Sequence, residues 1–208
     1  MMQEPNDSSL SPLSEEKKSE FIVVDAIYSE GKIILPESPT SLQLFEKNYF
    51  GHVTEKNGSK SLELDTIEAL LLLERSRLRI FNDAGTEITA EEILTQTAKK
   101  DERIWVKYLV YRDLRQRGYI VRMGYGDNID FRVFPRGSTQ KSGIAKYFIY
   151  ILEEGHRIHL QNLDKITAQT LTARKILSLA IVDRLGDITY YLLEQLQFQP
   201  NTKTNKKQ

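Results

Sequence analysis

The feature that most constrains the fold is a succession of short apolar or alternating runs in the second half of the chain. Turn signals separate five such runs, which read YIVRM, IDFRVF, AKYFIYIL, KILSLAIVD and ITYYLLEQL. Runs of this length, rich in β-branched and aromatic residues, predict β-strands. Apolar residues at helical spacing predict a helix from Asp101 to a stop at Gly118 and an amphipathic helix at about 160–174. This half is therefore expected to form a sheet with two helices.

The first half of the chain predicts a smaller α+β unit. FIVVDAIY, the turn SEGK and IILP predict a β-hairpin over residues 21–35. Spacing and capping residues predict three helices, over 39–50, over 65–75 with Asp65 or Thr66 as N-cap, and from Thr89 with a capping box to Glu92.

These patterns divide the chain into four parts. Residues 1–19 are polar and without periodicity, which predicts a disordered tail, and residues 199–208 predict a flexible tail of the same kind. An N-terminal α+β domain is expected over 20–98 and a C-terminal domain over 101–198, with the polar joint TAKKDE between them.

Composition excludes several classes of site. The 208 residues contain no cysteine, which excludes disulfides, thiolate zinc sites, iron–sulfur clusters and cysteine nucleophiles, and fits a reducing cytoplasm. No window is long and apolar enough for a membrane-spanning helix, and the first residues lack a secretory signal. We therefore expect a cytoplasmic protein that does not contact a membrane.

The charges balance, with 29 Lys and Arg against 29 Asp and Glu. A protein that grips nucleic acid alone usually carries a basic excess. The balance fits a well-mixed surface, or alternatively a subunit whose faces have opposite sign and suit docking to a partner.

Four stretches resemble one family, the archaeal tRNA-splicing endonucleases, or tRNA-intron lyases. They are YLVYRDLRQRGYIVRMG, IDFRVFPRG, AKYFIYIL and TARKILSLAIVDRLGDITYY, and IEALLLLERSRL looks like the family's N-terminal domain. The resemblance implies an α+β fold, with a small N-terminal α+β domain followed by a restriction-endonuclease-like mixed-sheet C-terminal domain. It also implies RNA cleavage without a metal or other cofactor, by a general base, a general acid and a cation that stabilises charge on the phosphorus.

The family's catalytic tyrosine, histidine and lysine align with Phe134, Ile144 and Lys175. Only Lys175 is retained, since Phe134 cannot accept a proton and Ile144 cannot donate one. Lys175 has an alternative interpretation as a strand-end lysine kept for solubility or an ion pair. Two further family positions, where arginines sandwich a bulged base, hold Ala168 and Tyr190.

Four other side chains are candidates to replace the missing acid and base. They are Tyr147, Tyr150, His156 and His159, of which Tyr147 is expected to share a strand face with Ala145 and Ile149. A structural role as core or rim aromatics, or as loop histidines, is the favoured interpretation of all four.

The resemblance also assigns a docking role to the turn in IVDRLGDITYY. In the family an acidic turn of a non-cutting subunit enters a basic cleft on a cutting subunit, and the matching acids here are Asp183 and Asp187. The alternative is a simple hairpin turn with solvated aspartates. The last strand, ITYYLLEQLQ, is apolar enough to pair with an edge strand of a partner.

Together these features predict the structural, non-catalytic subunit of a tRNA-splicing endonuclease. It is expected to form a heterotetramer with a catalytic paralogue and to act on precursor tRNA at bulge–helix–bulge sites, recognised by shape. Two alternatives are an active endonuclease with a remodelled acid and base, and a binding module in another RNA-processing task.

Overall fold

The computed structural model describes residues 23–56, 58–126, 128–138 and 143–194. The tails predicted over 1–19 and 199–208 lie outside these residues. The first part of the chain forms β1 (Val24–Ser29), β2 (Lys32–Pro36), α1 (Pro39–Glu46), β3 (His52–Lys56), β4 (Ser59–Leu64), α2 (Thr66–Glu74), β5 (Leu78–Asn82), β6 (Glu87–Ile88) and α3 (Ala90–Ala98). The second forms α4 (Ile104–Gln116), β7 (Ile120–Met123), β8 (Phe131–Phe134), β9 (Tyr147–Glu153), α5 (Leu160–Thr172), β10 (Ile176–Val182) and β11 (Ile188–Leu193).

The N-terminal strands form one sheet in the order β3-β4-β2-β1-β5-β6. The predicted hairpin is confirmed, because β1 and β2 pair antiparallel with Ile27 opposite Ile34. β5 then adds parallel to β1, with Val24 opposite Leu78. A parallel pair needs a crossover, and here β2, α1, β3, β4 and α2 lie between the two strands in the chain.

Capping residues set the helix starts in this half. The Thr89 side chain accepts a hydrogen bond from the Glu92 backbone N–H, and the Glu92 side chain accepts one from the Thr89 backbone N–H, as the capping box predicts. Asp65 is the N-cap of α2. The helix predicted over 39–50 ends earlier, at Glu46. The chain leaves the helix because Tyr49 adopts φ 61°, a left-handed conformation that a right-handed helix does not contain.

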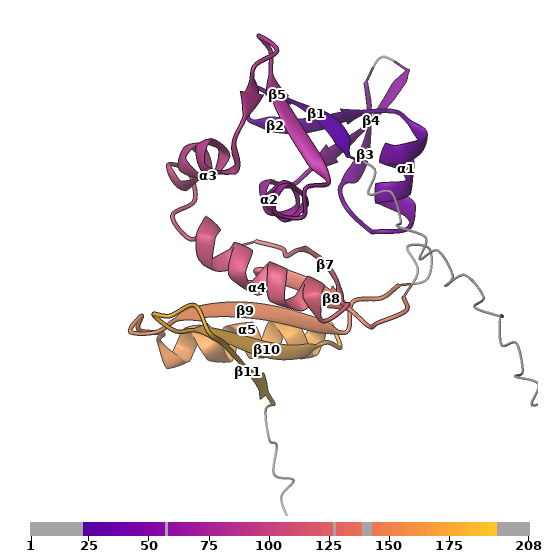
Figure 1. Ribbon diagram of the computed structural model, residues 1–208. Helices are drawn as coiled ribbons and strands as arrows, with labels where there is room; N and C mark the ends of the chain where they lie inside the picture. The colour runs from indigo at the N-terminus through magenta and orange to yellow at the C-terminus, as the bar shows by residue number, and fades with distance from the viewer. Residues whose placement is uncertain (1–22, 57, 127, 139–142, 195–208) are drawn as a thin grey trace, which may run out of the picture.

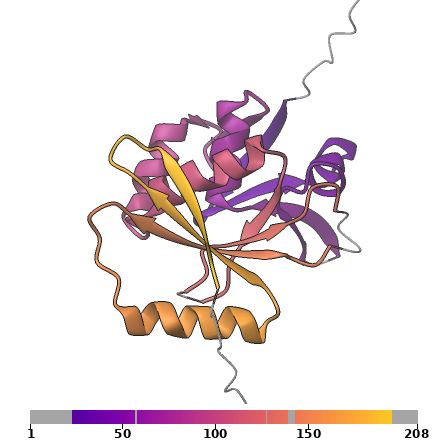
Figure 2. The ribbon, with the colours of Figure 1, turned by 90° about the horizontal axis from the view of Figure 1, so that it is seen from below.

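The C-terminal strands form a second sheet, ordered β11-β10-β9-β8-β7. β9 and β10 run parallel, joined through α5, and the other neighbours are antiparallel. α4 lies on the face of this sheet that meets the N-terminal half, and α5 covers the opposite face (Figures 1 and 2). The mixed sheet and its two helices agree with the expected α+β class.

One hydrophobic core runs from the first sheet through α2 and α4 to the second sheet (Figure 1). Leu35, Leu72 and Val110 are among its fully buried members. A smaller cluster, which includes Ile166 and Leu177, lies beneath α5. The two halves therefore share a core, so that α4 is held from both sides. No helix in the described part of the chain is long and apolar enough to cross a membrane.

A buried charge cluster fastens the two halves to one another. The Glu68 carboxylate on α2 accepts the N–H of Gly51 at 2.9 Å and that of Asp65 at 3.2 Å. Arg122 of β7 reaches it from the other sheet, with its Nη1 at 3.3 Å from Glu68 Oε1 and 2.6 Å from the Gly51 carbonyl oxygen. Burial, aided by the nearby Asp65 charge, raises the pKa of Glu68 to about 7, although Arg122 and the two N–H donors oppose the shift.

Candidate functional site

Strand register brings the three positions that the resemblance assigns to catalysis to one end of the C-terminal sheet. Phe134 is the last residue of β8, and Lys175 directly precedes β10. Between these strands lies the start of β9, where the Lys146 N–H bonds Val133 O at 2.9 Å and Lys146 O accepts the Ile176 N–H at 3.0 Å. Because neighbouring strands are about 4.8 Å apart, Phe134 and Lys175 stand roughly 10 Å apart across the sheet end.

The side chains at these positions form an incomplete site. Phe134 is half-buried and lines a cavity of about 190 Å³ together with Tyr49 and Arg122. Ile144 precedes β9 and is 72% exposed, with a hydrocarbon side chain that carries no proton donor. The Lys175 ammonium forms no ion pair with another residue in the described ranges. The arrangement retains a cation and lacks ionisable groups at the other two positions.

Tyr147 and Tyr150, two candidates to replace the missing acid and base, lie on opposite faces of β9. Tyr147 packs with Ile149 against the core beneath α4, while Tyr150 packs against the cluster beneath α5. Ala145 belongs to the α5 side, so the expectation that it shares a face with Tyr147 is wrong. The reason is that regular alternation starts only where β9 starts, at Tyr147.

The two histidines lie at the other end of the sheet. β9 has seven residues, and at about 3.3 Å each it carries the chain about 20 Å from the Lys175 end before His156 follows. His156 Nδ1 lies 3.8 Å from the Glu153 carboxylate, and His159 is the N-cap of α5. Neither imidazole can serve as the missing acid at the Lys175 end.

Ala168 and Tyr190, which the resemblance matches to two arginines, lie on opposite faces of the sheet. Ala168 is exposed on α5. Tyr190 turns toward α4, where its hydroxyl donates to Asp113 Oδ2 at 2.8 Å. Burial and this hydrogen bond raise the pKa of the Tyr190 phenol. The pair therefore cannot enclose one base within this chain.

The turn between β10 and β11 is organised by one of its two aspartates. Asp183 Oδ1 accepts the N–H of Leu185 at 2.8 Å and that of Asp187 at 2.9 Å. Gly186 has φ 87° and leaves room for Leu109 of α4, which a Cβ at this position would meet at 3.4 Å. Asp187 and Leu185 are exposed, Leu185 by 89%. The two hydrogen bonds within the turn explain Asp183, whereas no side-chain contact in the described part of the chain explains Leu185 or Asp187.

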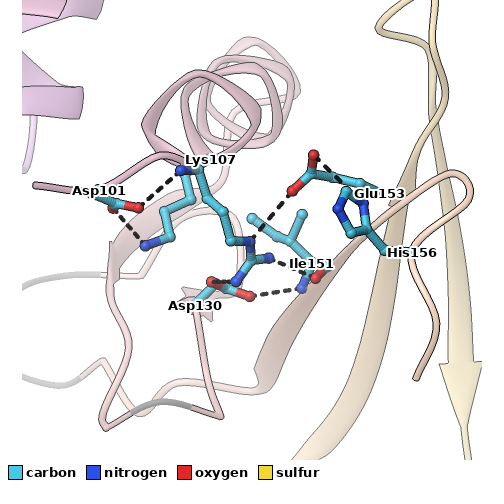
Figure 3. A network of polar contacts seen from close by, with 7 residues as sticks. Asp101, Lys107, Asp130, Ile151, Glu153 and His156 are labelled. Atoms are coloured by element: carbon cyan, nitrogen blue, oxygen red, sulfur yellow. Dashed lines mark hydrogen bonds and ion pairs between the residues drawn. The ribbon is translucent and has the colours of Figure 1, made fainter. Parts of the chain in front are cut away.

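A polar network that local sequence patterns do not indicate joins α4 to the sheet (Figure 3). It lies at the same sheet end as this turn, because Glu153, one of its members, is paired with Val182, the last residue of β10. The buried Asp130 carboxylate accepts the Ile151 N–H at 2.7 Å, and burial raises its pKa against the opposing effects of that bond and of Arg103. Arg103, at the start of α4, places Nη1 3.4 Å from Asp130 and donates through Nη2 to the Ile151 carbonyl at 2.7 Å. Its Nε lies 3.5 Å from Glu153, and beside it Lys107 pairs with Asp101 at 2.7 Å. The network clamps α4 to β8 and β9, a structural role.

Among the described residues, no group of histidine, aspartate and glutamate side chains is arranged to hold a metal ion.

Comparison with known proteins identifies relatives over most of the chain. Residues 24–94 match the family model for the tRNA intron endonuclease, N-terminal domain, and residues 104–190 match that for the catalytic C-terminal domain. A tRNA-splicing endonuclease of Thermococcus onnurineus is 38% identical over 159 residues, 75% of this chain and 86% of the relative. One from Methanothermobacter thermautotrophicus is 32% identical, covering 74% and 87%. One from Pyrococcus abyssi is 31% identical, covering 85% and 98%.

Proposed function

The chain belongs to the tRNA intron endonuclease family, and on that premise we propose that it is the structural, non-catalytic subunit of a tRNA-splicing endonuclease. The observation that carries the proposal is the make-up of the Lys175 end of the sheet. The resemblance matches Phe134 and Ile144 to the general base and the general acid, and neither side chain has an ionisable atom.

The rate acceleration that a general acid and a general base would supply decides between an active and a structural subunit. A positioned general acid or base contributes about 10²–10⁴-fold in rate. Loss of both removes several kcal/mol of transition-state stabilisation, since each tenfold corresponds to about 1.4 kcal/mol. Lys175 alone supplies only electrostatic stabilisation of the transition state. This chain by itself should therefore have almost no RNA-cleaving activity.

A non-catalytic chain of this kind would act by binding to a catalytic paralogue. We propose that the Asp183–Asp187 turn docks into a basic cleft of a catalytic paralogue, with the exposed Asp187 and Leu185 at the contact. β11 is the edge of its sheet, and Tyr191 and Leu192 on it are 53% and 61% exposed. An apolar edge of this kind is an aggregation hazard unless it is paired, which supports pairing with a strand of the partner.

The complete enzyme would be a cytoplasmic heterotetramer of two such chains and two catalytic paralogues. It would recognise precursor tRNA at a bulge–helix–bulge, by shape and not by sequence, as is common for folded RNA. The balanced charge of 29 basic and 29 acidic side chains fits a subunit that contributes an acidic docking turn.

Co-expression tests the proposal. A paralogue carrying tyrosine, histidine and lysine at the matching positions is expressed with this chain, and the mixture is examined by sizing with light scattering and by cleavage of precursor tRNA. We expect a mixed tetramer that cleaves, with the lone chain as the inactive control. If the two chains do not associate, or the paralogue cleaves equally well without this chain, the proposal is wrong.

A further inference from the structure

A cavity of about 250 Å³ lies between α4 and the C-terminal sheet, distinct from the cavity that Phe134 lines. We call it the tyrosine cleft. The residues that line it include Leu114, Arg117, Tyr119, Tyr147, Tyr190 and Leu192. Three tyrosines thus face one space, Tyr119 from the connection between α4 and β7, Tyr147 from β9 and Tyr190 from β11.

Each of these tyrosines has a cation over its ring. The distances from guanidinium carbon or ammonium nitrogen to ring centroid are 4.9 Å for Arg136 and Tyr119, 5.2 Å for Lys146 and Tyr147, and 5.7 Å for Arg117 and Tyr190. Such contacts hold cations and planar rings together at one place. Aromatic faces beside Arg and Lys are also the combination on which single-stranded nucleic acid binds, with bases on the rings and phosphates on the cations.

The three cations differ in how far they are neutralised. Arg117 pairs with Asp113 at 2.8 Å. Arg136 and Lys146 are exposed, and neither forms an ion pair with another described residue. In a chain of zero formal net charge, two cations with no ion pair among the described residues, both beside one aromatic cleft, favour an anionic ligand.

The size and place of the cleft favour a nucleotide over a peptide. About 250 Å³ is below the roughly 300–1,000 Å³ of drug-sized pockets, which suits a single ring system. Tyr147 begins β9 beside Lys146, at the same sheet end as Lys175. RNA brought to that end by the assembled enzyme would therefore pass the cleft.

We infer that the tyrosine cleft binds one unpaired nucleobase of the RNA, stacked on Tyr119 and Tyr147, with Arg136 and Lys146 against the flanking phosphates. The inference rests on the proposed function for the identity of the RNA. It gives the non-catalytic chain a direct part in holding the substrate. Tyr190 acts as a wall of the cleft, since its hydroxyl is already bonded to Asp113.

Fluorescence anisotropy of the full-length chain with a labelled bulge–helix–bulge RNA tests this inference. The double variant Tyr119→Leu/Tyr147→Leu keeps apolar volume but removes both stacking faces, and we expect it to bind at least about tenfold more weakly. Arg136→Gln/Lys146→Gln should also weaken binding and flatten its dependence on salt. Tyr125→Leu is the matched control, because Tyr125 has Arg132 4.1 Å over its ring but does not line the cleft. It should bind like the wild type.

Photocross-linking separates the possible failures. With 4-thiouridine in the bulges, we expect cross-links to peptides that contain Tyr119 or Tyr147 in the wild type, and their loss in the double leucine variant. Circular dichroism and thermal unfolding confirm that the variants fold. Absence of these cross-links, or wild-type affinity of the double variant, overturns the inference, as does a double variant that loses only association with the paralogue.

The same measurements keep the two proposals apart. An active mixed tetramer whose RNA affinity and cross-links do not depend on the cleft would refute the cleft alone. Cross-links in the cleft without any active tetramer would refute the structural-subunit proposal and leave the base-binding cleft standing.

Discussion

Replacement of Glu68 by glutamine tests the electrostatics that join the two halves. Glu68 is 2% exposed, and burial raises its pKa from 4.5 to about 7. The folded state therefore binds this proton more tightly than the unfolded chain does. Protonation of Glu68 therefore adds to the free energy of unfolding. This contribution is fully present below about pH 4.5 and is lost as the pH rises through about 7.

The size of the effect follows from the shift. A difference of one pKa unit corresponds to about 1.4 kcal/mol, so the wild type should lose about 2–3 kcal/mol from this group between about pH 5 and pH 8. Glutamine keeps an oxygen that can accept the Gly51 N–H but has no titrating proton. The variant should therefore lack this part of the pH dependence.

Urea unfolding followed by circular dichroism, at both pH values and one ionic strength, measures the difference. Glu91→Gln, at an exposed position on α3, is the control and should follow the wild type. The reasoning is refuted if Glu68→Gln loses as much stability as the wild type between the two pH values, because the titrating group would then lie elsewhere.

Three further predictions concern single side chains. Lys175→Ala in this chain should slow single-turnover cleavage by the assembled enzyme by less than about tenfold, since no acid or base acts with it; a greater loss with assembly intact would make Lys175 catalytic. Asp187→Lys leaves Asp183 to cap the turn and should prevent assembly with the paralogue, as judged by light scattering; normal assembly of the folded variant would reduce the loop to a hairpin turn. Asp130→Ala should lower the free energy of unfolding in urea by about 2–3 kcal/mol, because it leaves the buried Ile151 N–H without its acceptor and removes one of the partners of Arg103, whereas Asp130→Asn should cost less; equal losses would contradict this role of the carboxylate.

Local signals in the sequence were sufficient for most of the elements. The hairpin over 21–35, the capping box at Thr89 and the strand runs of the second half depend on residues close together in the chain, and the structure has them. The sequence pattern predicts a later end for α1 than the structure has, because the left-handed backbone conformation of Tyr49 has no signature in the residue type, whereas a glycine would have indicated it.

Local sequence patterns do not predict which residues far apart in the chain come into contact. Glu68 and Arg122 are 54 positions apart, and only the packing of α2 against the second sheet brings them together. The same holds for Arg103 and Asp130, and for the opposite placement of Ala168 and Tyr190. The tyrosine cleft is likewise lined by residues of α4, β9 and β11. The periodicity of the sequence predicts each of these elements but does not show that they meet.

On the proposed function, this chain lacks its own cleavage chemistry because Phe134 and Ile144 stand where the resemblance expects the base and the acid. The most direct test is single-turnover incubation of the purified chain alone with a bulge–helix–bulge RNA in the presence of a chelator. We predict no product with a 2′,3′-cyclic phosphate. Formation of that product by the chain alone, abolished by Lys175→Ala, would contradict the account.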